Sequence, residues 1–125
     1  MTIEAVADTV TDIARDFTAL CKAGKFDQAG EDYWADSVVS LEPFGEGAVT
    51  RGIAQVRSKG EAWTHANEIN SVAVEGPYVH GDQFLVRFTM DVTQKASGQR
   101  VSMDEMALYT LKNGKIVEER FFYGS

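Results

Sequence analysis

Residues 35–52, ADSVVSLEPFGEGAVTRG, contain the segment from which the fold of this chain can be worked out. Their alternation of apolar and polar side chains predicts a short strand over residues 37–44. The strand has to end, or lie at a sheet edge, at Pro43, because proline has no backbone N–H to donate. Glu42 therefore closes the strand on the same face as Phe44, and its carboxylate is our first candidate functional group.

On both sides of this strand, apolar residues follow a helical period. Over residues 3–23 they recur every three or four positions, which predicts a long amphipathic helix. A shorter helix is expected near residues 27–34, and a third over residues 52–66, where Gly60 lowers the helix propensity. Beyond this point the pattern changes to that of strands, expected near residues 68–79, 83–95, 99–112 and 115–123.

The order of these elements indicates the fold class. Helices come first and strands afterwards, with one strand between them, which predicts an α+β domain. We expect three N-terminal helices packed on one face of a curved antiparallel sheet. At 125 residues the chain is long enough for one domain over residues 1–125 with its own core.

Turn residues set the expected strand register. Asn113-Gly114 predicts a two-residue hairpin, and residues 96–98 fit a three-residue loop that ends in glycine. This register places the following side chains on the face beneath the helices: Phe84, Val86, Phe88, Met90, Val92, Asp104, Met106, Leu108, Glu119, Phe121 and Tyr123. A two-residue turn in the earlier loop would instead bring Arg87 and Asp91 to that face. We favour the first register because it gathers more apolar side chains there.

The opposite face is predicted to be too apolar for simple solvent surface. It would carry Met103, Tyr109, Ile116 and Phe122 beside its charged residues. Such a set on an outer sheet face predicts a homodimer contact.

Composition and charge narrow the class of partner. A formal net charge of -7 repels phosphate backbones and anionic lipid, so neither nucleic acid nor a membrane surface is expected as a partner. The N-terminus carries acids where a secretory signal needs basic residues, and a cytoplasmic location is expected. One cysteine, Cys21, permits no intramolecular disulfide, and no His or Cys spacing typical of a metal site occurs. We expect neither a metal nor an organic cofactor.

The order of elements, the segment ADSVVSLEPFG at residues 35–45 and the closing GKIVEERFFYG at residues 114–124 resemble the nuclear transport factor 2-like superfamily. Its cystatin-like α+β barrel is a cone with an open mouth. Members include ketosteroid isomerases, polyketide cyclases of the SnoaL type, limonene-epoxide hydrolases, scytalone dehydratases and proteins without known activity. The resemblance implies a pocket for a small apolar molecule.

Residue by residue, the resemblance is incomplete. The catalytic aspartate of ketosteroid isomerase, its general base, corresponds to Glu42. The two donors of its oxyanion hole correspond to Phe17 and Met106, which cannot donate a hydrogen bond. The last-strand aspartate of the epoxide hydrolase corresponds to Phe121. The resemblance therefore implies a proton-transfer site without implying steroid isomerisation.

Glu42 is the predicted general base, because an apolar wall would disfavour its charged form and make it a better proton acceptor near neutral pH. The alternative is a rim carboxylate paired with Arg51. Asp104 and Glu119 are candidates for a second inward carboxyl, with solvation or an ion pair as the plainer interpretation. Tyr123 is a candidate hydroxyl donor. The predicted pocket-lining residues are Phe17, Tyr33, Phe44, Trp63, Phe88, Met90, Met106, Leu108, Glu119 and Phe121.

Two functions remain open at this point. The first is a cofactor-independent isomerase, cyclase or dehydratase that uses Glu42 on a small apolar substrate. The second is a non-catalytic ligand-binding or dimeric assembly domain of the same fold. An open apolar cleft would favour a ligand, and a cone filled by side chains would favour assembly.

Overall fold

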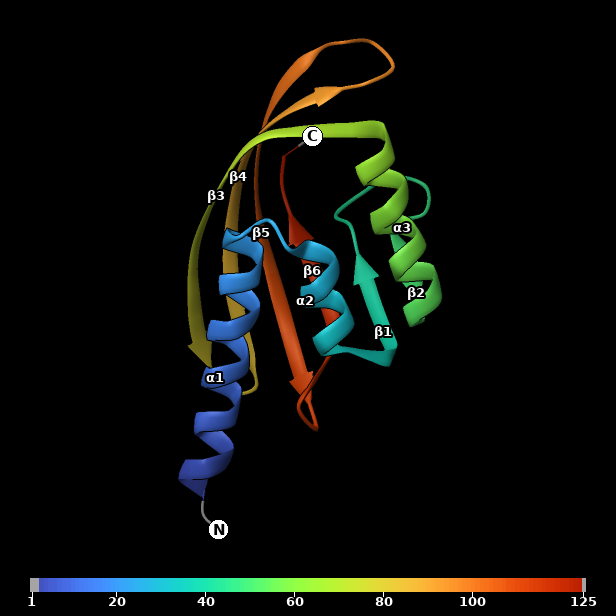
Figure 1. Ribbon diagram of the computed structural model, residues 1–125. Coiled ribbons are helices and arrows are strands. Elements are labelled where there is room, and N and C mark those ends of the chain that lie inside the picture. Colours follow the sequence, from blue (N-terminus) through green and yellow to red (C-terminus); the bar gives the residue numbers. More distant parts are fainter. Residues whose placement is uncertain (1–2, 125) are drawn as a thin grey trace.

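The computed structural model describes the backbone of residues 3–124 and the side chains of residues 10–124. Two helices open the chain, α1 (Ile3–Lys22) and α2 (Phe26–Tyr33), and a third, α3 (Ile53–Ala66), follows two strands (Figure 1). The strands are β1 (Trp34–Leu41), β2 (Val49–Arg51), β3 (Asn67–His80), β4 (Gln83–Gln94), β5 (Arg100–Lys112) and β6 (Lys115–Phe122).

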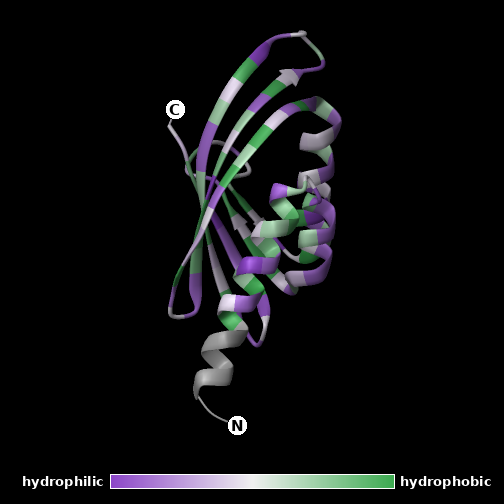
Figure 2. Cartoon of the chain, turned by 60° about the vertical axis from the view of Figure 1, so that its left-hand side comes forward, coloured by the Kyte–Doolittle hydropathy of each residue, from purple (hydrophilic) through white to green (hydrophobic). Residues whose placement is uncertain are grey.

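The six strands form one curved sheet in the order β2-β1-β6-β5-β4-β3. All neighbours are antiparallel except β1 and β6, which run parallel. The three helices lie on one side of the sheet (Figure 2). The predicted α+β fold is therefore confirmed, with one parallel pair and with an additional short strand, β2, between the predicted strand over residues 37–44 and the predicted third helix.

The core lies between the helices and the concave face of the sheet. Phe17 of α1 contacts the rings of Phe84 and Tyr109, with centroid separations of 5.7 and 4.7 Å. Val38, Val56 and Ile116 are fully buried around them. Phe17 thus carries the apolar face of α1 against β4 and β5, and the helix also packs along β3.

The face of β5 is the main correction to the predicted register. The β4–β5 hairpin is closed by a hydrogen bond from the Gln94 N–H to the Gln99 carbonyl, so its turn has four residues, 95–98, beyond this closing pair. The β5–β6 hairpin begins in the expected register, with Lys112 opposite Lys115, but slips by one residue beyond Leu111 and Ile116. Each difference shifts the strand pairing by one residue. Together they turn the side chains of β5 to the face opposite to the predicted one, whereas the side chains of β4 and β6 remain on their predicted faces.

The one-residue slip between β5 and β6, which leaves Val117 without a Cα partner, has a physical reason. Ile116 and Phe121 are five positions apart, so a regular strand cannot turn both toward the same face. An extra residue between them allows Ile116 to be buried and Phe121 to line the interior. A second irregularity occurs at Gly76–Pro77, where the register of β3 against β4 shifts between Glu75 and Tyr78.

The inversion of β5 changes which side chains meet beneath the helices. Glu105 and Tyr109 are Cα partners of the inward residues Phe88 and Phe84, so they face inward. Asp104, Met106 and Leu108, which we expected on that face, lie on the outer face. No helix of the described residues is long and apolar enough to cross a membrane.

Candidate functional site

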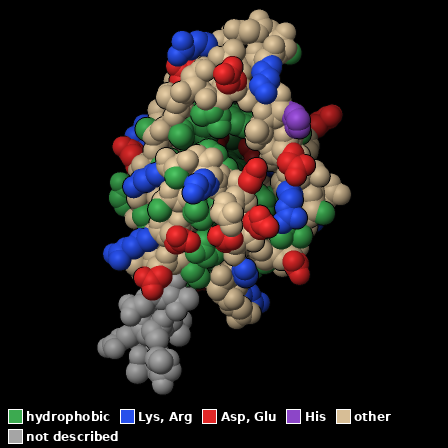
Figure 3. Space-filling view, viewed as in Figure 1, with side chains coloured by type: hydrophobic (Ala, Val, Ile, Leu, Met, Phe, Trp, Pro, Cys, Tyr) green, Lys and Arg blue, Asp and Glu red, His purple; other side chains and the backbone are tan. Residues whose placement is uncertain are grey.

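A cavity of about 640 Å³ opens between the helices and the concave face of the sheet. Figure 3 shows it as a hollow surrounded by hydrophobic side chains on the face where α2, α3 and β3 meet. Its size is within the range typical of small-molecule sites. Its apolar walls include Phe26, Val56, Trp63, Ile69, Met90 and Met103.

A second hollow, of about 560 Å³, lies against β1 and the β5–β6 hairpin. Its charged side chains, Glu31, Asp36, Lys112 and Lys115, are exposed. Because it contains no buried ionisable group, we place the candidate site in the first cavity.

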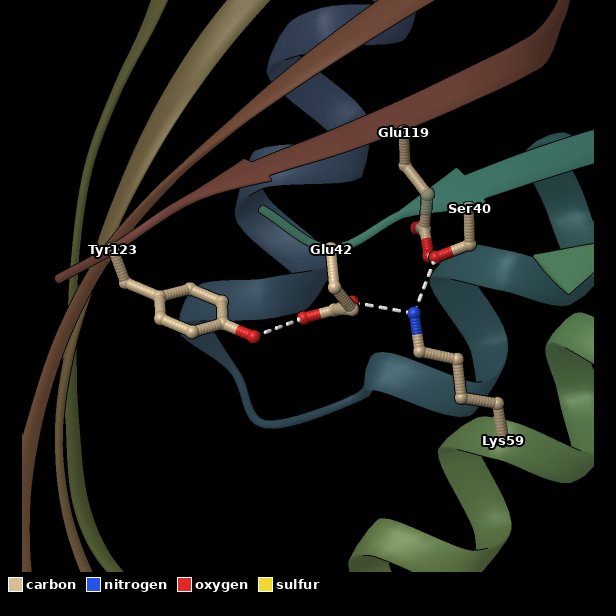
Figure 4. Close-up of polar contacts among 5 residues, drawn as sticks. All are labelled: Ser40, Glu42, Lys59, Glu119 and Tyr123. Carbon is tan, nitrogen blue, oxygen red and sulfur yellow. Dashed lines mark hydrogen bonds and ion pairs between the residues drawn. The ribbon is translucent and has the colours of Figure 1, made fainter. Parts of the chain in front are cut away.

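Glu42 follows the last residue of β1, and its side chain is 21% exposed. One carboxylate oxygen, Oε1, accepts a hydrogen bond from the Tyr123 hydroxyl at 2.7 Å. The other, Oε2, lies 2.5 Å from the ammonium of Lys59 on α3 (Figure 4). The expected alternative partner, Arg51, pairs instead along the backbone with Val39. Glu42 is thus held from two sides at one end of the cavity.

A second carboxyl lies deeper, at the buried end of the same hydrogen-bonded chain. Lys59 also donates to Ser40 Oγ at 2.7 Å, and Ser40 donates to Glu119 Oε2 at 2.6 Å. Ser40 is fully buried and Glu119 is 6% exposed. Burial raises the pKa of Glu119, although the Ser40 hydroxyl and Lys59 oppose the rise. The indole N–H of Trp34 faces this carboxyl without completing a hydrogen bond.

Glu105 is the third carboxyl of the cavity, and sequence reasoning placed it on the wrong face. It projects inward from β5 and, among the described residues, has no hydrogen-bond partner. Burial, and then repulsion from Glu42 and Glu119, raises its pKa to about 7, while Lys59 opposes the rise. A neutral carboxyl here can donate a hydrogen bond or a proton at physiological pH.

Two tyrosines complete the polar part of the site. Burial, followed by the hydrogen bond to Glu42, raises the pKa of Tyr123 to about 12. Burial, followed by the nearby Glu119, raises the pKa of Tyr109 well above its usual value. Both hydroxyls are therefore protonated donors near neutral pH. The hydroxyl of Tyr109 has no partner among the described side chains.

The cavity contains most of the residues that the sequence singled out. These are Glu42, Tyr123, Phe17, Trp63, Phe88, Met90, Glu119 and Phe121. It does not contain Tyr33, whose hydroxyl donates to Asp16 on the helix surface. Phe44 is 48% exposed and packs its ring edge-on against Tyr123 at a centroid separation of 5.3 Å.

Three further candidates are corrected by the inverted face of β5. Asp104 points away from the cavity and accepts hydrogen bonds from Arg87, with 2.7 Å between its Oδ2 and the guanidinium. Met106 and Leu108 lie on the same outer face. The prediction of a second inward carboxyl is therefore wrong for Asp104, whereas Glu119 does point inward. Among the described residues, no three His, Cys, Asp or Glu side chains are grouped closely enough to hold a metal ion.

The comparison with known proteins agrees with this architecture. The profile of the SnoaL-like domain family matches residues 8–123. A candidate SnoaL-like polyketide cyclase from Mesorhizobium loti, also designated a carbohydrate phosphatase, is 50% identical, with a TM-score of 0.87. The match covers 98% of this chain and 100% of that chain.

Two more distant structures share the fold. A candidate isomerase from Bacillus subtilis is 16% identical, with a TM-score of 0.74 and coverage of 94% of this chain and 87% of that one. TerC, co-crystallized with polyporic acid, is 15% identical, with a TM-score of 0.69 and coverage of 93% and 92%. No curated protein matches the chain.

Proposed function

We propose that this protein, which belongs to the SnoaL-like domain family, is a cofactor-independent enzyme that moves a proton on a small, largely apolar carbonyl compound. Isomerisation, cyclisation and dehydration are the reactions that such a step serves. The observation that carries the proposal is a pair of carboxyls in one cavity with opposite surroundings. Glu42 contacts a cation and a hydroxyl donor, whereas Glu105 is desolvated and unpaired.

Glu42 is the proposed proton acceptor. Its two oxygens accept bonds from Tyr123 and Lys59, which fix the orientation of the carboxylate. A carboxylate has about four lone-pair positions, so two remain for a substrate C–H or O–H group. The apolar walls around it keep water from competing for the proton.

Glu105 is the proposed proton donor toward the substrate oxygen. When different surroundings give two carboxyls in one site different proton affinities, the carboxyl that holds its proton more tightly is assigned as the acid and the other as the base. Its neutral carboxyl, together with the free hydroxyl of Tyr109, would stabilise negative charge that develops on a carbonyl oxygen. These two groups of β5 would supply the donors that Phe17 and Met106 cannot provide.

The charges of the cavity favour an uncharged substrate. Carboxyls outnumber the single lysine in the wall, so a phosphorylated or carboxylated compound would be repelled. This argues against phosphatase chemistry, to which one designation of the Mesorhizobium loti relative refers. The apolar walls of the cavity support a small apolar ligand.

Hydrogen exchange provides the test of this function. A panel of cyclic ketones in D₂O is followed by NMR for deuterium uptake at the carbon next to the carbonyl. We expect Glu42→Gln to slow exchange about 10²- to 10⁴-fold while ligand quenching of Trp34 and Trp63 fluorescence persists. The matched control is Glu61→Gln, an exposed residue of α3. Unchanged exchange in Glu42→Gln removes Glu42 from the mechanism.

A non-catalytic ligand carrier is the second candidate. The observation in its favour is that both oxygens of Glu42 already have partners. A carrier would bind ketones from the panel without deuterium uptake in any variant.

We also propose a homodimer through the outer face of the sheet, with a corrected set of residues. Met103, Tyr109 and Ile116, which we expected there, face the interior. Met106 and Phe122 are Cα partners on adjacent strands and are 38% and 48% exposed. Exposed apolar side chains that adjoin on a sheet face favour a partner surface.

A further inference from the structure

The cavity wall has one basic side chain among the residues described, Lys59, against the carboxyls of Asp27, Glu42, Glu105 and Glu119. An ammonium in contact with one carboxyl stabilises that group in its ionised form far more than carboxyls farther away. The position of this lysine therefore decides how charge is divided within the cavity.

The contacts of Lys59 are unequal. Its ammonium lies 2.5 Å from Glu42 Oε2 and 2.7 Å from Ser40 Oγ (Figure 4). It also sits 5.4 Å from the ring centroid of Phe121. Glu119 receives its hydrogen bond from Ser40, so the lysine reaches it only through that hydroxyl. Glu105 has no hydrogen bond to Lys59.

We propose that Lys59 is a positioning residue whose ammonium is directed at Glu42, the proton acceptor, and leaves Glu105 unpaired as the proton donor. The inference rests on the proposed function for its chemical meaning, but its test needs no substrate. Without this cation, repulsion among the carboxyls of the cavity would hold the proton of Glu105 to a higher pH.

The other polar groups that line the cavity do not provide a substitute charge. From α1 comes Cys21, a thiol whose pKa burial raises to about 12. The other elements contribute Asp27 of α2, Ser40 of β1, Tyr109 and Glu105 of β5, and Glu119 and Tyr123 at or beyond β6. All of these are neutral or acidic, so loss of Lys59 is uncompensated.

The direction of the effect follows from the surroundings of Glu105. Lys59 lowers the pKa of Glu105 and of Glu119, so its removal raises both. The substitution Lys59→Arg retains the charge, whereas Lys59→Met removes the charge and the hydrogen bonds together.

The experiment is a ¹³C NMR titration of the glutamate side-chain carboxyls between pH 4 and 9, without ligand. Glu105→Gln identifies the Glu105 signal by its loss. We expect that signal to titrate near pH 7 in the unmodified protein and about one pH unit higher in Lys59→Met. Lys59→Arg should leave the midpoint unchanged, and so should Arg57→Met, an exposed position on the same helix.

A second variant separates charge from folding. Lys59→Gln retains a hydrogen-bond donor without the charge and should shift the midpoint in the same direction. If Lys59→Met does not fold, Lys59→Gln decides the question alone. An unshifted Glu105 signal in the folded variant overturns the proposal. That result would leave the exchange test of Glu42→Gln untouched, because the titration involves no turnover.

Discussion

Glu105 of β5 lies directly opposite Phe88 of β4, with both side chains on the concave face of the sheet. The pairing brings a carboxyl into an apolar wall, and burial is the largest cause of its raised pKa. A shift of the β5 register by one residue would have turned the exposed Asp104, instead of Glu105, toward the concave face. The chemical character of the cavity therefore depends on the register of one strand.

Replacing Glu105 with glutamine should change how stability depends on pH. Its pKa is about 7 in the folded chain against an ordinary value of 4.5. The folded state thus binds this proton more tightly, and the free energy of unfolding falls as pH rises from about 4.5 through 7.

Glu105→Gln should remove this contribution and stabilise the protein above pH 7, by an amount on the order of 2 kcal/mol. Urea unfolding at pH 5 and pH 8 measures the difference. Part of the pH dependence of the unfolding free energy will remain in Glu105→Gln, since the pKa of Glu119 is also raised. Glu61→Gln serves as the exposed control, and equal slopes for Glu105→Gln and the unmodified protein would contradict the prediction.

Replacement with alanine should change the stability of the protein in opposite directions at two helical glycines, Gly30 and Gly60. A Cβ on Gly30 of α2 would lie 2.6 Å from the ring of Trp34, which has to move. We expect Gly30→Ala to lower the free energy of unfolding by about 1–3 kcal/mol and to change the tryptophan emission.

Gly60 of α3 is the matched comparison. A Cβ there meets nothing within 4 Å, so helix propensity alone decides the outcome. Gly60→Ala should raise stability by about 0.5–1 kcal/mol in the same urea experiment. A stabilised Gly30→Ala variant would show that the Trp34 contact with α2 is not a tight one.

The proposed dimer predicts that a charge on the outer face separates the subunits. We expect the unmodified protein to sediment as a dimer at micromolar concentration and Phe122→Lys to sediment as a monomer, because a buried lysine without a partner is costly. Val49→Lys is the control, since Val49 is 51% exposed on β2, at the sheet edge. A monomeric unmodified protein excludes the dimer.

The inverted face of β5 left a signal in the sequence. Of the odd positions 101–111, all but Glu105 are apolar, whereas of the even positions 102–110 only Met106 and Leu108 are. The alternation of this strand considered alone therefore indicates the observed face. Turn residues pointed to the other register, because they carry no information about the four-residue loop or the slip at Val117.

No comparable pattern in the sequence indicates that Lys59 belongs to the site. It lies among the mixed polar residues of α3, 17 positions from Glu42, and nothing in the local pattern connects the two. Ser40 and Glu42 share a strand face, so their common direction was predictable. That a helix would bring an ammonium between them depends on how α3 packs against β1.

The sequence by itself determined the three helices, the first strand and the four C-terminal strands, the inward faces of β4 and β6, and a carboxylate at the end of β1. These features follow from local periodicity and from proline and glycine positions, which act over a few residues. Only the tertiary structure decided the face of β5 and the partners of Glu42. Both depend on contacts between distant segments, where burying Ile116 together with Phe121 outweighs regular strand pairing.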